Sequence, residues 1–207
     1  IFKYFKIHPI TISNESNNSF IKHYNSPLIK STIIYNGRKQ PARSDNLNNV
    51  RREISDIKFK FGQNVKILIN IGRIEEQKNH IMLCNAINRV NDLGYNVVVL
   101  ILGGYRNKTS DKILSDIREI NNDKFIIKGE VNNPTDYLFL TDYFILSSNY
   151  EGMPISLIES FSCDSIPIST PVGGVPEMIG KDGFLSKSLN EIDMAECIIC
   201  TISINKE

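Results

Sequence analysis

Several features that would mark common protein classes are missing from this sequence of 207 residues. No apolar run approaches the roughly 20 residues of a membrane-spanning helix. The net charge is +1 and the basic residues are spread along the chain, which argues against a nucleic-acid-binding protein. The chain begins at Ile1 without a signal-peptide pattern, so we expect a fragment or a processed form. We expect a cytoplasmic protein, with peripheral contact at the inner face of the membrane as an open alternative.

Cysteine is scarce, and its spacing gives little support to a metal centre. The four cysteines are Cys84, Cys163, Cys197 and Cys200, all in apolar surroundings. Cys197 and Cys200 form a C-x-x-C, but no second pair or histidine cluster completes a zinc site. We therefore expect buried apolar residues in a reducing compartment.

Two common nucleotide-binding fingerprints are also missing. The stretch L-G-G-Y-R-N-K-T-S (102–110) approaches a P-loop, but that motif requires Gly directly before Lys, and Asn107 stands there. The stretch does not fit G-x-G-x-x-G either, so a P-loop ATPase and a dehydrogenase are both disfavoured. We interpret Gly103-Gly104 as a loop that must stay clear of a neighbouring ligand.

From Val65 onward the sequence alternates apolar runs with amphipathic stretches. Strands that are apolar throughout, separated by helix-length connections, predict βαβ units in a parallel sheet with helices on both faces. The sequence thus predicts a doubly wound parallel α/β domain. The predicted strands cover 65–71, 97–102, 124–128, 143–147 and 166–170, and the stretches of helical character cover 79–92, 110–120, 135–140 and 154–163.

The first sixty residues follow a different pattern. Strands are predicted at 10–13 and 31–35, around a helix from about Glu15 to Tyr24 with Ser13 as its N-cap. A polar stretch with a proline then follows and has linker composition. We therefore divide the chain into the tail of another domain (1–35), a junction (36–60) and a main domain (61–207).

Ligands of open α/β sheets bind outside the C-terminal ends of the strands, and I-G-R-I-E-E-Q-K-N (71–79) falls there. Gly72 permits a tight turn, and the cations Arg73 and Lys78 at a helix N-terminus would form a diphosphate clamp. In the alternative, both are solvated loop cations, as surface Arg and Lys usually are.

A helix start lies in the segment E-G-M-P-I-S-L-I-E-S (151–160). Pro154 suits the first helical position, which places the N-cap on Met153, a residue without a side-chain oxygen. The backbone amides available to an anion would then be those of Ile155, Ser156 and Leu157.

Two glutamates flank this helix start. With the turn between them, Glu151 and Glu159 can face one cleft from its two ends. In the alternative, Glu151 only favours the positive end of the helix dipole and Glu159 is solvated. The segment by itself leaves both possibilities open.

The stretch T-P-V-G-G-V-P-E-M (170–178) follows the last predicted strand. Gly173-Gly174 would bring the backbone close to whatever lies over the sheet, and Glu177 follows at the start of a short helix. A plain tight turn would explain the two glycines equally well.

In this order along the chain, these motifs resemble the C-terminal, nucleotide-sugar-binding domain of the family 4 retaining glycosyltransferases, which have the two-domain GT-B fold. The resemblance covers about Ile10 to Leu185. The matching motifs are Y-N-G (35–37), G-R-x-x-x-x-K (72–78), K-G-x-V (128–131), S-x-x-x-E-G-M-P (147–154), E-x7-E (151–159) and P-V-G-G-V-P-E (171–177).

The resemblance implies a role for each matching residue. Arg73 and Lys78 would hold the donor diphosphate, Glu151 would read hydroxyls of the donor sugar, and Glu159 would bind the ribose. Lys128 and Val131 would lie near the base, and the backbone amides around Met153, Ile155 and Ser156 would meet the sugar and the distal phosphate. The remaining donor-binding residues implied are Gly72, Gly173, Gly174 and Glu177.

The implied activity is transfer of a sugar from a UDP-, GDP- or ADP-sugar to a glycan or lipid-linked acceptor, with retention of configuration and without a metal cofactor. No Asp-x-Asp metal motif lies near the site. Two alternatives stay open. One is a truncated, non-catalytic nucleotide-binding module, and the other is an epimerase or phosphorylase of the same architecture, although no pyridoxal-phosphate lysine stands out.

The sequence also departs from the family pattern. A turn that usually carries Gly is filled by Cys163-Asp164-Ser165, and Asp tolerates the left-handed conformation that such a turn needs. Residues 1–35 match only the end of the acceptor-side domain. Without the missing N-terminal domain as its partner, the chain alone is expected to bind a donor without efficient transfer.

Overall fold

A six-stranded parallel sheet forms the centre of the molecule, in the strand order β5-β4-β3-β6-β7-β8. The structure is a computed structural model that describes residues 7–25, 30–105, 108–120 and 123–204. The predicted doubly wound α/β fold is confirmed. Its strands are β3 (Lys66–Ile71), β4 (Val97–Leu102), β5 (Phe125–Gly129), β6 (Tyr143–Leu146), β7 (Ile166–Ser169) and β8 (Phe184–Leu185).

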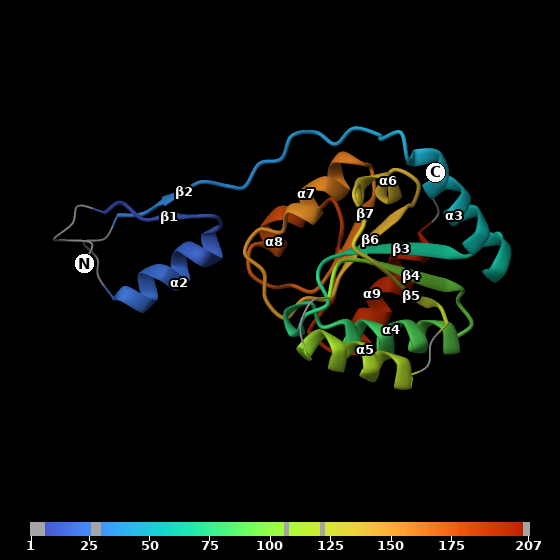
Figure 1. Ribbon diagram of the computed structural model, residues 1–207. Coiled ribbons are helices and arrows are strands. Elements are labelled where there is room, and N and C mark those ends of the chain that lie inside the picture. Colours follow the sequence, from blue (N-terminus) through green and yellow to red (C-terminus); the bar gives the residue numbers. More distant parts are fainter. Residues whose placement is uncertain (1–6, 26–29, 106–107, 121–122, 205–207) are drawn as a thin grey trace.

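Helices cover both faces of the sheet (Figure 1). Alternate residues of one strand pack on opposite sides: Leu68 of β3 belongs to the core under the first group of helices, and Ile69 to the core under the second. This two-sided burial explains the unbroken apolar runs of the strands. The first group is α4 (His80–Asp92), α5 (Lys108–Ile120) and α9 (Glu191–Ser203), and the second is α3 (Leu47–Phe61), α6 (Thr135–Leu138), α7 (Ile155–Ser162) and α8 (Val175–Ile179).

The strand order reverses between β3 and β6. The chain runs outward from β3 to β5 on one side, then returns and runs outward from β6 to β8 on the other. Loops diverge at such a switch point, which leaves a crevice at the C-terminal ends of the two strands. The loop after β3, with the 3-10 turn η1 (Glu76–Lys78), and the loop after β6 therefore border the same crevice.

The helix α3 was not predicted, because residues 36–60 have the composition of a linker. Val50 and Ile54, four positions apart, form one apolar stripe that is buried against the second core. The other positions of α3 are mostly polar, so the average composition concealed the stripe. The division of the chain at residues 35 and 60 stays a prediction.

The N-terminal unit consists of β1 (Ile10–Thr11), α2 (Asn14–Tyr24) and β2 (Thr32–Ile33), with β1 and β2 parallel. The predicted N-cap is confirmed, since the hydroxyl of Ser13 accepts a hydrogen bond from the backbone N–H of Ser16. The unit projects from the α7–α8 end of the domain and reaches α3 through a long extended segment (Figure 1). In the described part of the chain, no helix is long and apolar enough to cross a membrane.

Two local predictions at α7 have different outcomes. The expected N-cap at Met153 is wrong by one position: Pro154 has extended backbone angles and is the cap, so the helix begins at Ile155. The predicted left-handed residue is confirmed, because Asp164 has φ +57° in the turn between α7 and β7.

The cysteines are free thiols. Cys84, Cys163 and Cys197 are buried as predicted, and burial raises the pKa of each thiol to about 11. Cys200 is exposed, which corrects the prediction that all four are buried, because α9 turns this position outward. Within the described ranges, no cluster of three or more His, Cys, Asp or Glu could hold a metal ion.

Candidate functional site

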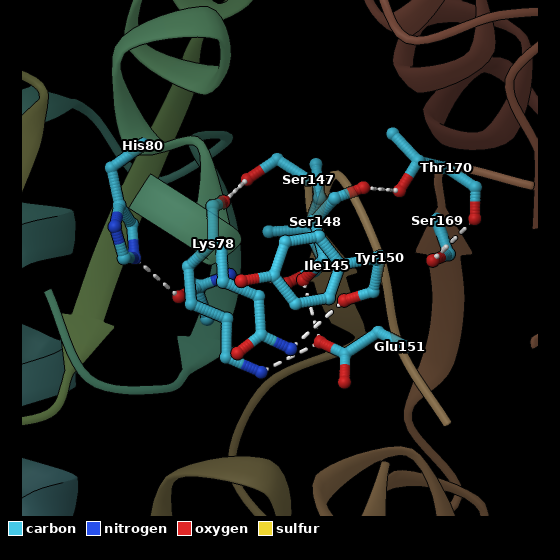
Figure 2. Close-up of polar contacts among 11 residues, drawn as sticks. Lys78, His80, Ile145, Ser147, Ser148, Tyr150, Glu151, Ser169 and Thr170 are labelled. Atoms are coloured by element: carbon cyan, nitrogen blue, oxygen red, sulfur yellow. Dashed lines mark hydrogen bonds and ion pairs between the residues drawn. The ribbon is translucent and has the colours of Figure 1, made fainter. Parts of the chain in front are cut away.

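Lys78 and Glu151 meet at the switch point. The Nζ atom of Lys78 lies 2.6 Å from Oε1 of Glu151, and the two side chains are only 16% and 7% exposed (Figure 2). Lys78 is contributed by η1 after β3, and Glu151 by the loop after β6. A charged pair this buried is stabilised only if its remaining hydrogen bonds are satisfied, so the atoms around it decide its geometry.

Serine hydroxyls fix both partners of this pair. The hydroxyl of Ser148 donates to the same Glu151 oxygen at 2.6 Å, and that of Ser147 donates to the carbonyl of Lys78 at 2.7 Å (Figure 2). Thr170, after β7, donates from Oγ1 to the carbonyl of Ser148 at 2.7 Å. The carboxylate of Glu151 is therefore held in one orientation before any ligand arrives.

Amide side chains join the loops after β3 and β6. The Gln77 side chain donates to the carbonyl of Tyr150 at 2.9 Å, and the backbone N–H of Asn149 donates to the carbonyl of Gln77 at 2.8 Å. Asn79, the N-cap of α4, donates from Nδ2 to Oδ1 of Asn149 at 2.9 Å. The two loops thus form one surface.

The second cation of the expected clamp lies elsewhere. Arg73 is exposed, and its Nη1 atom lies 3.2 Å from Oε1 of Glu75. No contact joins Arg73 to Lys78 in the described residues. The structure therefore buries Lys78 beside Glu151 and leaves Arg73 exposed beside Glu75.

A buried, neutral histidine, His80, lies two residues after Lys78 at the start of α4. His80 is 1% exposed, and burial, then the charge of Lys78, lowers its pKa to about 3. Asn70 donates from Nδ2 to the carbonyl of Ile145 at 2.7 Å, so its Oδ1 accepts from Nε2 of His80 at 3.1 Å. This chain of hydrogen bonds links β3, α4 and β6, and Figure 2 labels His80 and Ile145 at its two ends.

Glu159 lies in α7 and is buried, but it has a cationic partner. Nε of Arg38 lies 2.7 Å from Oε1 of Glu159. The same extended segment holds the turn before α7, since Asn36 donates from Nδ2 to the carbonyl of Met153 at 2.9 Å. The two glutamates of the E-x7-E motif therefore have separate cations, Lys78 for Glu151 and Arg38 for Glu159.

The start of α7 has no side-chain cap. Pro154, the N-cap, makes no side-chain hydrogen bond to the helix amides. The backbone amide of Leu157 donates to the carbonyl of Pro154 at 3.2 Å. The prediction that this amide is free to bind an anion is therefore wrong. Ile155 is exposed and Ser156 is half-buried, so their amides are the ones left for an anion at this end.

Backbone packing accounts for the glycines. Gly173 has φ +54°, and a Cβ there would lie 1.7 Å from the carbonyl oxygen of Glu151. A Cβ on Gly174 would lie 2.5 Å from the carbonyl oxygen of Gly152, and one on Gly72 would lie 3.0 Å from Cε of Lys78. A Cβ on Gly103 would lie 1.9 Å from the Gly72 oxygen. These glycines let neighbouring loops approach one another closely. This packing explains their presence without reference to a ligand.

Lys128 is tied to α3. Its Nζ lies 2.8 Å from Oε2 of Glu53, which also accepts from the hydroxyl of Tyr137 at 2.9 Å. Burial, then the hydrogen bond to Glu53, raises the pKa of Tyr137. Val131 is half-buried against the second core. These contacts fix the end of β5 and the loop that follows it.

Glu177 binds the N-terminal unit. Its carboxylate accepts from the backbone N–H of Asn14 at 3.0 Å, from the Asn14 side chain and from the hydroxyl of Tyr35. The hydrogen bond from Tyr35, then that from the Asn14 backbone, lowers the pKa of Glu177. A carboxylate at the first turn of α2 is also favoured by the helix dipole.

Sequence reasoning missed several residues of the site. Arg38 acts through a contact 121 positions away, so no local pattern marks it. Ser148 stands at an unspecified position of the motif 147–154, and His80 lies just after Lys78, so neither was singled out. Asn70 carried a usable signal, because it is a polar residue inside an otherwise apolar strand.

Two curated bacterial relatives cover most of this chain at moderate identity. A capsular polysaccharide biosynthesis glycosyltransferase, CapH of Staphylococcus aureus, is 30% identical over 174 residues, which is 83% of this chain and 45% of the relative. A diphospho-undecaprenol-linked N-acetylgalactosaminyltransferase of Campylobacter jejuni is 30% identical over 158 residues, which is 75% of this chain and 39% of the relative. The chain thus spans less than half the length of these relatives.

Solved structures share the fold. A glycosyltransferase of Rickettsia africae superposes with a TM-score of 0.78 at 20% identity, over 95% of this chain and 53% of the other. Anabaena HepE, in complex with UDP and glucose, superposes with a TM-score of 0.75 at 17% identity. The superposition covers 94% of this chain and 53% of HepE. Neighbours of this kind identify the sheet and its helices as the C-terminal domain of a GT-B fold.

Residues 65–203 match the sequence profile of the family described as Glycosyl transferases group 1. The match covers most of the main domain, and the chain belongs to this family.

Proposed function

We propose that the whole protein transfers a sugar from a nucleoside-diphosphate sugar to a glycan or lipid-linked acceptor, and that this chain supplies the donor-binding half. The buried Lys78–Glu151 pair at the switch point is the observation that carries the proposal. A UDP-glucose complex of HepE and the lipid-linked substrate in the name of the Campylobacter relative agree with it. The order of the motifs further supports a family 4 enzyme that retains configuration.

The chemistry needs positive charge at the leaving group. Cleavage of the anomeric C–O bond leaves an oxocarbenium-like sugar and a diphosphate with new negative charge. The ammonium group of Lys78 has three donors, so it can hold Glu151 and a phosphate oxygen together. Arg73 and the amides at the start of α7 would add to this, and one such preorganised donor lowers the barrier by on the order of 3 kcal/mol. The scheme needs no metal ion.

The other roles that we propose are those that the resemblance to the family implies. Glu151 would accept hydrogen bonds from the sugar hydroxyls, and Glu159 from the ribose. Lys128 and Val131 would border the base, which is that of UDP, GDP or ADP. Gly72, Gly173 and Gly174 would keep the loops close together, while Glu177 would close the crevice from the α8 side.

A melting-temperature panel tests the donor site. UDP, GDP or ADP should raise the melting temperature of the chain, since a ligand that binds only the folded state stabilises it. The double variant Arg73→Ala, Lys78→Ala should abolish that rise. Lys39→Ala with Lys112→Ala removes the same charge at two exposed positions and should keep it. No melting shift with any of the three at millimolar concentration would refute the donor site.

The division of labour between the glutamates has its own test. Glu159→Ala should weaken binding of the bare nucleotide and of the nucleotide sugar alike. Glu151→Ala should weaken only the nucleotide sugar, as measured by calorimetry. Equal losses for both ligands in Glu151→Ala would show that our assignment of these two residues is wrong.

A further inference from the structure

Arg38 lies outside every motif of the family, yet its guanidinium reaches Glu159. The two residues are 121 positions apart in sequence, and Nε of Arg38 lies 2.7 Å from Oε1 of Glu159. The Arg38 side chain is 55% exposed, whereas that of Glu159 is 7% exposed. The pair therefore lies where the buried face of α7 meets the surface.

The contact leaves hydrogen-bonding capacity on both partners. A guanidinium has five N–H donors and a carboxylate has two oxygens. In the described residues, only Nε of Arg38 and Oε1 of Glu159 are engaged in this pair. Oε2 of Glu159 is therefore available to a ligand. A carboxylate that is buried and fixed at one oxygen is a preorganised acceptor for a hydroxyl group.

The segment that carries Arg38 is itself anchored. Asn36, two residues earlier, donates to the carbonyl of Met153 at 2.9 Å, immediately before α7. Arg38 thus approaches Glu159 from a fixed point beside the start of the same helix. Neighbouring Lys39 is exposed and makes no hydrogen bond or ion pair in the described residues, so it provides a matched cation for comparison.

We propose that Arg38 is a positioning residue of the nucleotide site, which holds Oε1 of Glu159 so that Oε2 accepts a hydrogen bond from the ribose. The proposal rests on the proposed function, in which Glu159 meets the ribose. In this proposal, Arg38 is the residue that sets the preference for a ribonucleotide over its dideoxy form. Without Arg38, the carboxylate loses its fixed orientation and its partner charge.

A purely structural role would have a different signature. Loss of Arg38 leaves the buried carboxylate of Glu159 without its partner charge, so a fall in folding stability is expected in either case. If Arg38 only fastened its segment to α7, its loss would weaken the binding of all nucleotides equally. In that case the loss of Arg38 would not change how much the ribose hydroxyls contribute to the binding affinity of a nucleotide.

Calorimetry can separate these roles. UDP, GDP and ADP, each beside its 2′,3′-dideoxy form, are titrated into the wild-type chain, Arg38→Ala, Arg38→Lys and the control Lys39→Ala. Arg38→Ala should bind the ribonucleotide about tenfold more weakly, and its preference over the dideoxy form should fall by about fivefold. Arg38→Lys should be intermediate, and Lys39→Ala should match the wild type.

The outcomes distinguish the two proposals. If the wild type binds a nucleotide but Arg38→Ala keeps the full preference for ribose, the role of Arg38 is refuted and the donor site stands. Equal weakening of the ribo and dideoxy forms would also refute the positioning role. If the wild type binds none of the nucleotides, the proposed function fails, and the assignment of Arg38 fails with it. Urea unfolding of Arg38→Ala shows whether the fold is retained.

Discussion

At the residue scale, the crevice depends on charges that are held in pairs. Lys78 with Glu151 and Arg38 with Glu159 each place a buried carboxylate beside a more exposed cation. Loss of one partner would leave a buried charge uncompensated, which costs more than the pair itself contributes. Substitutions at these positions should therefore be compared with conservative variants.

His80 makes the stability of the protein depend on pH. Its pKa is about 3 in the folded chain and near 6.5 when exposed, so between these values the unfolded state binds a proton that the folded state does not. The free energy of unfolding should therefore fall as the pH falls through this window, by about 2 kcal/mol between pH 7 and pH 5. Urea unfolding at both pH values measures this loss.

The control is His80→Gln, which cannot titrate. It is expected to show a much smaller change over the same pH range, whatever its stability at pH 7. The exposed His8 and His23 remain in both proteins, so any contribution from them cancels. A wild-type slope equal to that of His80→Gln would contradict a buried, neutral imidazole.

At the element scale, α3 is part of the main core despite its polar composition. Ile54 is 5% exposed, and its truncation leaves a cavity between α3 and the sheet. Ile54→Ala should lower the free energy of unfolding by about 2–4 kcal/mol. Phe59→Ala, on the same helix but at a position 87% exposed, should change it by less than about 0.5 kcal/mol. Similar effects of the two substitutions in denaturant unfolding would show that α3 is not docked as described.

The Gly173 turn couples α8 to Glu151. Gly173→Ala meets both a left-handed backbone and the carbonyl oxygen of Glu151, so the loop carrying this glutamate must move. Gly180 has nearly the same φ, +51°, but nothing within 4 Å of an added Cβ. Gly180→Ala should therefore cost only the backbone strain, about 1–3 kcal/mol, whereas Gly173→Ala should cost more because it adds the clash with the Glu151 carbonyl.

Ligand binding separates these two glycine variants further. Gly173→Ala should weaken binding of a nucleotide sugar that Glu151 is proposed to contact, and Gly180→Ala should not. Thermal unfolding and calorimetry together measure both effects. Equal destabilisation by the two substitutions would mean that the contact with the Glu151 carbonyl is readily relieved.

At the scale of the whole molecule, Glu177 joins the N-terminal unit to the main domain. Its carboxylate is bound by donors from α2 and from the segment after β2. Glu177→Ala removes these bonds, so the amides of α2 should exchange hydrogen faster while those of β3 and β4 keep their protection. Native-state hydrogen exchange measures this difference.

A matched change elsewhere tests the specificity of that effect. Glu196 pairs with Lys187 at 2.9 Å on the exposed face of α9 and makes no contact with α2 in the described residues. Glu196→Ala should leave the exchange of α2 unchanged. If both variants change α2 exchange by the same amount, Glu177 is not the contact that fastens the unit.

The sequence determined the central architecture, because local patterns encode it. Strands buried on both faces need continuous apolar runs, and the helix-length stretches between them require parallel pairing. The left-handed Asp164 and the N-cap Ser13 were also predictable, since each depends on its own chain neighbours. The amphipathic helix α3 was missed because its apolar stripe is narrow.

Only the tertiary structure decided which charged side chains pair with one another. Nothing in the sequence pairs Lys78 with Glu151 rather than with Glu159, or brings Arg38 to α7, because these contacts span 73 and 121 positions. They form when parallel strands align their C-terminal ends at the switch point and the extended segment crosses α7. Local motifs therefore contained the residue types of the proposed nucleotide-sugar site, while the packing of the sheet and of the extended segment selected their partners.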